Sequence, residues 1–361
     1  MKIAIVGSRG IPSGYGGFET FVEEISVRLK QHAFDITVIC QLSESTLGEL
    51  KGIKLLYSRY SKASEPLRFY FDSIRMGIKE ADMILVCGVG GAVFYPLLKK
   101  RKHVLVTHLD GREELRGKYS FLKKKYVKLA QLFAARYSDH LIADGHSVEN
   151  HWRTVMHVPG DQISAIEFGA EINPETDNAV FERLNLVPGG YFLVVCRMVP
   201  ENNVEMIVKG YLKSGSRKRL VLVGDTPGAY GSALRLYSSS EIIFTNGIYD
   251  KPQLAALREK CFVYIHGHSV GGTNPSLLEA MAAGNICICH DNEFNRETTE
   301  GKMLFFKSWD ELAEQIIKVE GFNDTERKKY ADIAKGRILS YYNWDRITTE
   351  YVKLFNALMS K

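Results

Sequence analysis

Short apolar runs rich in β-branched residues alternate with stretches of helical periodicity along almost the whole chain, and this alternation restricts the possible folds most. In the first half, the runs predict strands at 2–6, 35–40, 53–57, 83–87, 103–107, 140–143 and 163–167. The clearest helical stretch between them has on one face Phe18, Phe21, Val22, Ile25 and Leu29. Near-continuous apolar strands separated by helices predict a parallel sheet covered on both faces.

The same pattern restarts after a PGG segment at 188–190. It continues through YFLVVCR, RLVLVG, EIIFT, CFVYIHG and ICICH, with helical stretches from about 203, 251 and 275. The last stretch, 308–361, predicts two or three helices. We therefore expect an α/β protein with two doubly wound, Rossmann-like domains that meet near 169–178, with ligands bound at the carboxyl ends of the strands in a shared cleft.

Composition excludes several classes of protein. Hydrophobic residues are 45% and charged residues 25% of the chain, which is the ordinary globular mixture and excludes a disordered or fibrous one. No stretch approaches the roughly 18 consecutive apolar residues of a membrane span. The start, MKIAIVGSRG, enters a strand pattern at residue 2 without the features of a signal peptide, so a cytoplasmic location is expected.

The six cysteines predict no disulfide framework and no zinc site. None forms a CxxC pair, and all lie in or beside apolar, strand-like runs: Cys40, Cys87, Cys196, Cys261, Cys287 and Cys289. Buried, reduced thiols are the interpretation that this placement favours.

The net charge of +5 is unevenly distributed. Residues 99–128 hold eleven Lys or Arg and three acidic residues, a local charge of +8 that leaves −3 for the rest of the chain. Part of this charge lies on a predicted helix, 118–137, whose apolar face would contain Tyr119, Leu122, Tyr126, Leu129 and Phe133. Lys123, Lys124, Lys125 and Lys128 lie off that face, where they are either solvated or contact anionic lipid. No nucleic-acid-binding signature accompanies them.

A glycine-rich loop follows the first predicted strand, in GSRGIPSGYGGFET, and precedes the first helix. Its last two glycines are Gly16 and Gly17. The spacing is neither GxGxxG nor a Walker loop. Since glycines let a backbone approach a phosphate closely, and helix N-termini offer free N–H groups, we expect a phosphorylated ligand near this loop. The alternative is a flexible turn.

The second domain begins with a strand that runs directly into Arg197, in CRMVPENN. An Arg at the carboxyl end of a strand projects toward the ligand edge and can bind a diphosphate with its guanidinium fork. A solvated surface Arg is the alternative reading of this position.

The most informative segment is YIHGHSVGGTNPSLLEAMAAGNICICH, residues 264–290. A strand ends near His266 and a loop with three glycines follows. Thr273 or Asn274 caps the next helix, with Pro275 at its first position. Glu279 lies in the first turns of this helix, where its carboxylate either stabilises the helix or accepts hydrogen bonds from the vicinal hydroxyls of a ribose.

These segments resemble the retaining GT-B glycosyltransferases that use nucleotide-sugar donors, and the resemblance covers essentially the whole chain. It rests on the first glycine loop, on Arg197 and on GGTNPSLLEAMAAG with Glu279. Three segments, GSRGIPSGYGGFETFVE, HLDG and HGHSVGGTNPSLLEAMA, are similar to a narrower branch. Members of that branch transfer L-rhamnose from dTDP-rhamnose during assembly of bacterial surface polysaccharides.

The resemblance implies a role for each part. Residues 1–172 would form an N-terminal acceptor-side domain and 173–343 a nucleotide-sugar-binding domain, with 344–361 a helix that packs back on the first domain. The donor would contact Gly16, Gly17, Arg197, Asn202, Gly271, Gly272, Thr273, Asn274 and Glu279. The family needs no metal ion, no DxD triplet occurs, and no cofactor besides the donor is expected.

The chain departs from the family pattern at two positions. The first of two glutamates that the family places eight residues apart is Gly271 here, so the carboxylate expected on the donor sugar is missing. This argues against glucose-type donors and is compatible with a 6-deoxy sugar. The expected phosphate-binding Lys is Asn202, so Arg197 and backbone N–H groups must carry more of the diphosphate charge.

Two further loops follow strands of the first domain. In THLDGRE, His108 or Asp110 would take the place of the family's His near the anomeric carbon, and Asp110 would orient or deprotonate an acceptor hydroxyl. In ADGHS, the second-rank candidates are Asp144, His146 and Ser147.

The function expected from the resemblance is transfer of a sugar, with retention, to a lipid-linked saccharide at the inner face of the cell membrane. No carboxylate is a convincing nucleophile, so front-face substitution is expected, with Arg197 and the 271–276 loop stabilising the leaving diphosphate. Two alternatives stay open: a nucleotide-sugar epimerase of the same fold, and a sugar-nucleotide-binding protein without catalysis.

Overall fold

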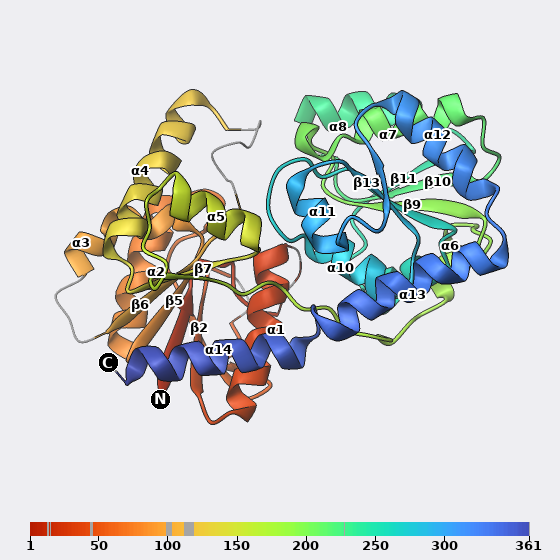
Figure 1. The fold of residues 1–361 in the computed structure, drawn as a ribbon. Helices are drawn as coiled ribbons and strands as arrows, with labels where there is room; N and C mark the ends of the chain where they lie inside the picture. The colour runs from red at the N-terminus through yellow and green to blue at the C-terminus, as the bar shows by residue number, and fades with distance from the viewer. Residues whose placement is uncertain are drawn as a thin grey trace. The chain divides into compact units, whose positions relative to one another are not determined.

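The computed structural model describes residues 1–12, 14, 16–43, 46–98, 103–111, 119–226 and 228–360. The chain divides into two compact units, each built on its own sheet (Figure 1). Unit 1 comprises Met1–Leu115, Tyr119–Phe168 and Asp345–Lys361, and unit 2 comprises Gly169–Trp344.

Unit 1 contains an eight-stranded sheet in the order β3-β4-β2-β1-β5-β6-β7-β8. The strands are β1 (Lys2–Val6), β2 (Asp35–Cys40), β3 (Glu49–Leu50), β4 (Ile53–Tyr57), β5 (Met83–Cys87), β6 (Val104–His108), β7 (His140–Ala143) and β8 (Ile163–Ala165). All pair in parallel except β3, an antiparallel edge strand of two residues that the sequence pattern did not predict. The strands β1 and β5 are almost wholly buried because helices cover both faces of the sheet.

The helices of unit 1 connect its parallel strands. They are α1 (Gly17–Gln31), α2 (Pro66–Glu80), η1 (Val89–Phe94), α3 (Tyr95–Leu98), α4 (Phe121–Tyr137), α5 (His146–Thr154) and α14 (Trp344–Met359). The last of these returns from the end of the chain to unit 1, where Phe355 packs edge-on against Phe34 and Tyr351 lies against Phe21.

Unit 2 contains a six-stranded parallel sheet in the order β11-β10-β9-β12-β13-β14. Its strands are β9 (Tyr191–Val195), β10 (Arg219–Val223), β11 (Ile242–Thr245), β12 (Val263–His266), β13 (Cys287–His290) and β14 (Leu304–Phe306). Its helices are α6 (Ala179–Arg183), η3 (Pro200–Asn202), α7 (Val204–Ser214), α8 (Gly228–Leu234), η4 (Arg235–Tyr237), α9 (Lys251–Lys260), α10 (Pro275–Ala282), α11 (Glu293–Thr299), α12 (Trp309–Glu320) and α13 (Asp324–Ser340). Side chains of its strands and of α7 and α12 form one continuous apolar core.

The prediction of two doubly wound α/β units is confirmed, as is the prediction of helices after residue 308. Each sheet also has one point where the strand order reverses. In unit 1 the chain runs outward from β1 through β2 and then resumes on the other side at β5, and in unit 2 the reversal lies between β9 and β12. Ligands of open α/β sheets bind outside the carboxyl ends of the strands at such points. We therefore expect sites at the loops after β1 and β5 in unit 1 and after β9 and β12 in unit 2.

Candidate functional site

The loop after β9 holds a buried anchor beside an exposed cation. Met198 is fully buried, and its N–H donates to the carbonyl of Asp225 at 3.1 Å. The Arg197 side chain is exposed. Asn202 is buried, and its Nδ2 donates to the carbonyl of Arg197 at 2.7 Å. The amide predicted to replace a phosphate-binding Lys is therefore used to hold the backbone that carries Arg197.

Hydrogen bonds join this loop to the one after β12. Both the N–H and the Oγ of Ser269 donate to the carbonyl of Glu201, at 3.0 and 2.9 Å. Asn203 Nδ2 donates to the carbonyl of Gly267 at 2.8 Å, and Ser276 Oγ to the carbonyl of Val195 at 2.9 Å. The two loops at the reversal point of unit 2 thus form one cross-linked platform.

The glycine loop ends at a capped helix N-terminus. Gly271 has a φ of +141°, a region that side chains rarely adopt, and a Cβ there would meet no atom within 4 Å. Of the two predicted caps, Asn274 is the one used, since its Oδ1 accepts from the N–H of Ser276 at 3.0 Å, with Pro275 first in the helix. Thr273 is buried and Gly272 half-buried. Asn274 therefore satisfies the first N–H groups of α10, because its carbonyl also accepts from those of Leu277 and Leu278, and the open space lies beside the glycine loop that precedes the helix.

Glu279 is the fifth residue of α10, and its carboxylate forms an ion pair with a residue that the sequence analysis missed. Arg258 of α9 places Nη2 2.5 Å from Glu279 Oε2, and the two side chains are 8% and 37% exposed. A buried guanidinium that fixes a half-exposed carboxylate orients it for a further ligand. Only the packing of α9 beside α10 brings this pair together, so no spacing in the sequence could have revealed it.

Three imidazoles lie at the same edge of the sheet and were also missed as site residues. His266 ends β12, and its ring stacks on that of His268 with centroids 4.4 Å apart. Burial lowers the pKa of His266 well below its usual range, assisted by His268 and His290. His266 is therefore neutral at neutral pH, so it adds no positive charge to the edge that carries Arg197.

The first glycine loop of unit 1 is arranged around a carboxylate. Gly16 is the N-cap of α1, with a φ of +125°, and Gly17 is the first helical residue. The side chain of Glu19 is only 8% exposed, and its Oε1 accepts from the N–H of Arg9 at 2.9 Å. An anionic group of the chain itself thus occupies the start of α1, where a phosphate was expected.

His108 is enclosed by aromatic rings. Its imidazole stacks on Phe168 with centroids 5.4 Å apart and on Tyr351 at 6.5 Å, and Phe18 and Phe21 close the other sides. The Nδ1 atom donates to the carbonyl of Leu109, and burial lowers the pKa of His108 to about 4. The sequence analysis predicted His108 or Asp110 near the anomeric carbon of the donor, but α1 and α14 cover the His108 ring, and its surroundings favour a packing role.

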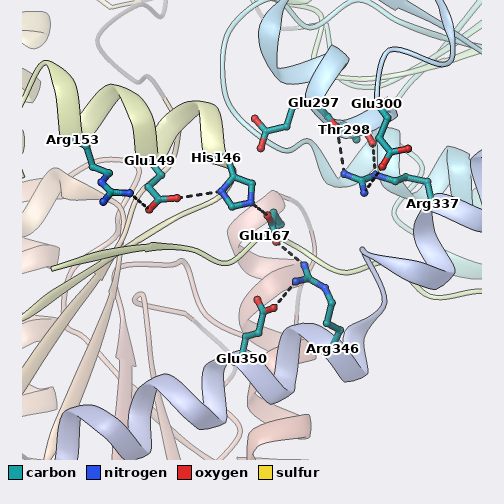
Figure 2. A network of polar contacts seen from close by, with 10 residues as sticks. All are labelled: His146, Glu149, Arg153, Glu167, Glu297, Thr298, Glu300, Arg337, Arg346 and Glu350. Atoms are coloured by element: carbon teal, nitrogen blue, oxygen red, sulfur yellow. Dashed lines mark hydrogen bonds and ion pairs between the residues drawn. The ribbon is translucent and has the colours of Figure 1, made fainter. Parts of the chain in front are cut away.

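The other predicted residues of unit 1 lie near the same edge. Asp110 follows β6 and is half-buried, and Asp144 follows β7 and is buried. His146 and Ser147 begin α5. Figure 2 shows that His146 belongs to a network of polar contacts, with Nδ1 3.2 Å from Glu149 and Nε2 3.8 Å from Glu167.

The same network attaches α14. Arg346 Nη2 lies 2.8 Å from Glu167, which is 1% exposed, and Nη1 lies 2.5 Å from Glu350 (Figure 2). Burial, with a contribution from neighbouring Glu167, raises the pKa of Glu350. These contacts assign His146 to the support of α14, a role that its position in the sequence did not indicate.

The predicted apolar face of the basic helix is wrong. The helix begins at Phe121, and its buried residues are Val127, Ala130, Gln131 and Ala134. Leu122 and Leu129 are exposed instead, because the small residues of α4 allow it to pack closely on η1. Lys123 and Lys125 lie over the rings of Tyr119 and Phe121, at 4.0 and 4.5 Å from the centroids. The basic residues at 99–102 and 112–118 lie outside the described residues.

The described residues contain neither a cluster of metal ligands nor a membrane-spanning helix. No three side chains of His, Cys, Asp or Glu gather there as ligands of a metal ion would. Within the same part of the chain, none of the helices combines the length and the apolar character needed to cross a bilayer.

Comparison with known proteins agrees with the fold and the two units. Residues 180–337 match the family described as glycosyl transferases group 1, and residues 1–171 match a domain of unknown function, DUF1972. An uncharacterized glycosyltransferase of Methanocaldococcus jannaschii, MJ1069, is 27% identical over 293 residues, which cover 75% of this chain and 72% of that protein.

Solved structures resemble the whole chain at low sequence identity. Sucrose-phosphate synthase from Thermosynechococcus elongatus is 15% identical with a TM-score of 0.83, and covers 99% of both chains. HepE of Anabaena, in complex with UDP and glucose, is 16% identical with a TM-score of 0.78, and covers 99% of this chain and 100% of its own. These likenesses show that the chain has the GT-B fold. Residues 180–337 belong to the group 1 glycosyltransferases.

Proposed function

We propose that the chain transfers a sugar from a nucleotide-sugar donor that binds at the platform of unit 2. The observation that carries this proposal is the pair of hydrogen-bonded loops at the reversal of the strand order, with exposed Arg197 on one and the start of α10 at the end of the other. A cationic fork beside a glycine loop, whose backbone a phosphate can approach closely, suits a diphosphate. The UDP and glucose bound by HepE, a structural neighbour, support a donor of this class.

Each residue of the platform has a role in this proposal. Arg197 and the backbone of the glycine loop at 271–274 hold the diphosphate and stabilise its growing charge as it leaves. Glu279, oriented by Arg258, accepts from the ribose hydroxyls. The leaving diphosphate takes the acceptor proton in a front-face substitution, so the configuration of the sugar is retained.

The donor sugar we propose is L-rhamnose, carried by dTDP. The support is Gly271, because the space beside it contains no carboxylate to bind the hydroxyls of a glucose-type sugar. Similarity of the GGFETFVE, HLDG and GGTNPSLLEAMA segments to rhamnosyltransferases of bacterial surface polysaccharides supports the same donor.

The acceptor we propose is a lipid-linked saccharide at the inner membrane face. Phe121 and Leu122, at the start of α4, are 71% and 77% exposed, beside exposed Lys123 and Lys125. Apolar and cationic side chains on one exposed helix suit the interface of an anionic bilayer.

A donor screen tests the proposal most directly. Thermal unfolding is measured with dTDP-L-rhamnose, UDP-glucose, dTDP and UDP, because a bound donor raises the melting temperature by mass action. We expect the largest shift with dTDP-L-rhamnose, and a larger shift with UDP-glucose would refute the sugar assignment. Incubation with labelled dTDP-L-rhamnose then separates transfer from release of a free epimer and from binding without turnover.

Co-sedimentation with vesicles tests the membrane location. Each Lys near an anionic surface contributes about 1 kcal/mol, so neutralising the four lysines at 123, 124, 125 and 128 weakens binding by about 4 kcal/mol at most. High salt should also release the wild-type protein. If wild type ignores phosphatidylserine vesicles at low salt, the surface of α4 is only a solvated face.

A further inference from the structure

Three consecutive residues lead into the glycine loop at 271–274, and each is hydrogen-bonded to a neighbouring loop. On the side of β9, Asn203 Nδ2 donates to the carbonyl of Gly267, and Ser269 donates to the carbonyl of Glu201. His268 lies between them, and its carbonyl accepts from the other side, where β13 is the neighbouring strand. The backbone that enters the glycine loop is therefore held from both of its neighbours in the sheet.

The donors on the side of β13 are two asparagines at the start of α11. Nδ2 of Asn292, the N-cap of this helix, lies 2.9 Å from the carbonyl oxygen of His268, and Nδ2 of Asn295 lies 3.1 Å from it. Asn295 is only 3% exposed, and it also donates to the carbonyl of His290 at 2.8 Å. An amide nitrogen has two hydrogens and a carbonyl oxygen has two lone pairs, so these bonds use both groups fully.

The helix that carries these amides is held at both ends. At its start, Oδ1 of Asn292 accepts from the N–H of Asn295 at 3.0 Å. At its other end, Arg337 of α13 donates to the carbonyls of Glu297 and Thr298, at 3.5 and 3.3 Å (Figure 2). Because a helix of seven residues is marginal on its own, these contacts keep the two amides in place.

A glycine loop needs such support before it can bind a ligand tightly. Gly271 has a φ of +141°, and a Cβ there would meet no atom within 4 Å, so packing around this residue does not fix the loop. Ordering such a backbone around a ligand costs conformational entropy, and the cost is smaller when the loop is held in advance. Only Ser269 and Val270 separate His268 from Gly271, so the position of His268 determines where the loop begins.

We propose that Asn292 and Asn295 are positioning residues for sugar transfer, which hold the glycine loop in the conformation that binds the donor diphosphate. They act through the backbone of His268 and contact neither substrate. This inference rests on the proposed function, because the loop that they hold is the one assigned to the donor.

The variants separate positioning from helix capping. Serine caps a helix about as well as asparagine, so Asn292→Ser keeps the cap of α11 but loses the amide that donates to His268. Asn295→Ala removes the second amide, and the double variant removes both. The matched control is Asn285→Ala, because Asn285 is 5% exposed and its Nδ2 donates to the carbonyl of Ala280 at 3.0 Å, at the opposite end of β13.

Two measurements are made on each variant of the full chain. Calorimetric titration with dTDP-L-rhamnose, dTDP and UDP-glucose gives the affinity for nucleotides, and steady-state kinetics with dTDP-L-rhamnose give kcat and the acceptor KM. Hydrogen-exchange mass spectrometry without a nucleotide reports how firmly residues 267–274 are held. Thermal unfolding measures the loss of stability separately.

We expect each single variant to weaken donor binding about two- to threefold, because the other amide still donates to His268. The double variant should weaken donor binding about 10- to 100-fold, more than the product of the two single effects. Its kcat should also fall while the acceptor KM stays unchanged, and exchange at 267–274 should become faster. Asn285→Ala should lower the melting temperature and leave both nucleotide affinity and this exchange unchanged.

Two results would overturn the positioning role: wild-type donor affinity in the double variant, or unchanged exchange at 267–274. An equal loss of donor affinity in Asn285→Ala would overturn it too, because lower stability alone would then weaken binding. If the double variant does not fold, Asn292→Ser decides by the same measurements, since its cap is intact. Wild type that binds none of the three nucleotides refutes the donor platform instead, and hydrogen exchange still decides whether the two amides hold the loop.

Discussion

The two sheets of the molecule present opposite chemistry at their reversal points. In unit 2, the loops after β9 and β12 are hydrogen-bonded to each other and expose Arg197. In unit 1, the loop after β1 is instead held by the buried carboxylate of Glu19, which accepts a hydrogen bond from the N–H of Arg9. The same doubly wound architecture thus exposes a guanidinium at one edge and uses a carboxylate to hold a loop at the other, so side chains and not topology distinguish the two edges.

The buried histidines of the two units also differ in their surroundings. His266 in unit 2 and His108 in unit 1 both end a central strand and both lose basicity through burial. His266 stacks on His268 beneath the glycine loop, whereas His108 stacks on Phe168 inside an aromatic cluster. Neither imidazole carries charge at neutral pH, so neither adds a positive charge to its edge.

The largest expected effect comes from removing the exposed guanidinium of Arg197. Arg197→Ala should lower kcat/KM about 100- to 1,000-fold, the loss typical of one group that stabilises transition-state charge, with kcat as well as donor affinity reduced. Arg197→Lys should recover little, because an ammonium cannot reproduce the fork. Steady-state kinetics at varied donor concentration measure kcat and kcat/KM for each variant. Arg217→Ala, an exposed Arg in the loop before β10, is the control, and wild-type turnover in either Arg197 variant would refute the role.

The second effect is a dependence of stability on pH. The unfolded chain protonates His108 near its ordinary pKa of 6.5, whereas the folded protein holds it neutral down to about 4. The free energy of unfolding should therefore fall as the pH falls from about 6.5 to 4, by up to about 3 kcal/mol. Urea titrations at several pH values measure it. His108→Phe keeps a ring beside Phe168 and should flatten this dependence, while His32→Phe, at an exposed site, should not.

The third effect tests the ion pair behind the donor platform. Glu279→Gln should lower donor affinity by about 1.5–3 kcal/mol, because the charge-assisted acceptor for the ribose is lost. It also leaves the buried guanidinium of Arg258 without its counter-charge, so the melting temperature should fall. Calorimetric titration and thermal unfolding separate the two losses, with exposed Glu259→Gln as control. Unchanged donor binding in a folded variant would contradict the ribose role.

The sequence predicted the architecture well, because buried parallel strands and amphipathic helices leave periodic patterns. It also located the loops that carry Arg197 and Asn274. It missed two contacts that only tertiary packing creates. These are the ion pair of Arg258 with Glu279 and the stacking of His266 on His268. The α4 face was wrong for the opposite reason, because small residues such as Ala130 and Ala134 pack more closely than the larger Leu122 and Leu129.

The smallest effect is expected from removing one hydrogen bond between the two loops of unit 2. It shows whether such bonds matter for donor binding in unit 2 and not in unit 1. Ser269→Ala removes the Oγ donor to the carbonyl of Glu201 but keeps the backbone donor, so we expect a loss of about 1 kcal/mol, seen as about fivefold weaker donor binding. Ser8→Ala is the matched change in unit 1, where Ser8 Oγ accepts from the N–H of Gly10 at 3.2 Å.

Since Ser8 stabilises the loop after β1 and not the donor platform, its loss should lower stability by a similar amount while the donor Kd stays unchanged. Calorimetric titration gives the donor Kd of each variant, and urea unfolding gives the free energy of unfolding of each. Equal effects of both variants on the donor Kd would mean that the loops of unit 1 contribute to donor binding as much as those of unit 2. The division of chemistry between the two edges would then have to be abandoned.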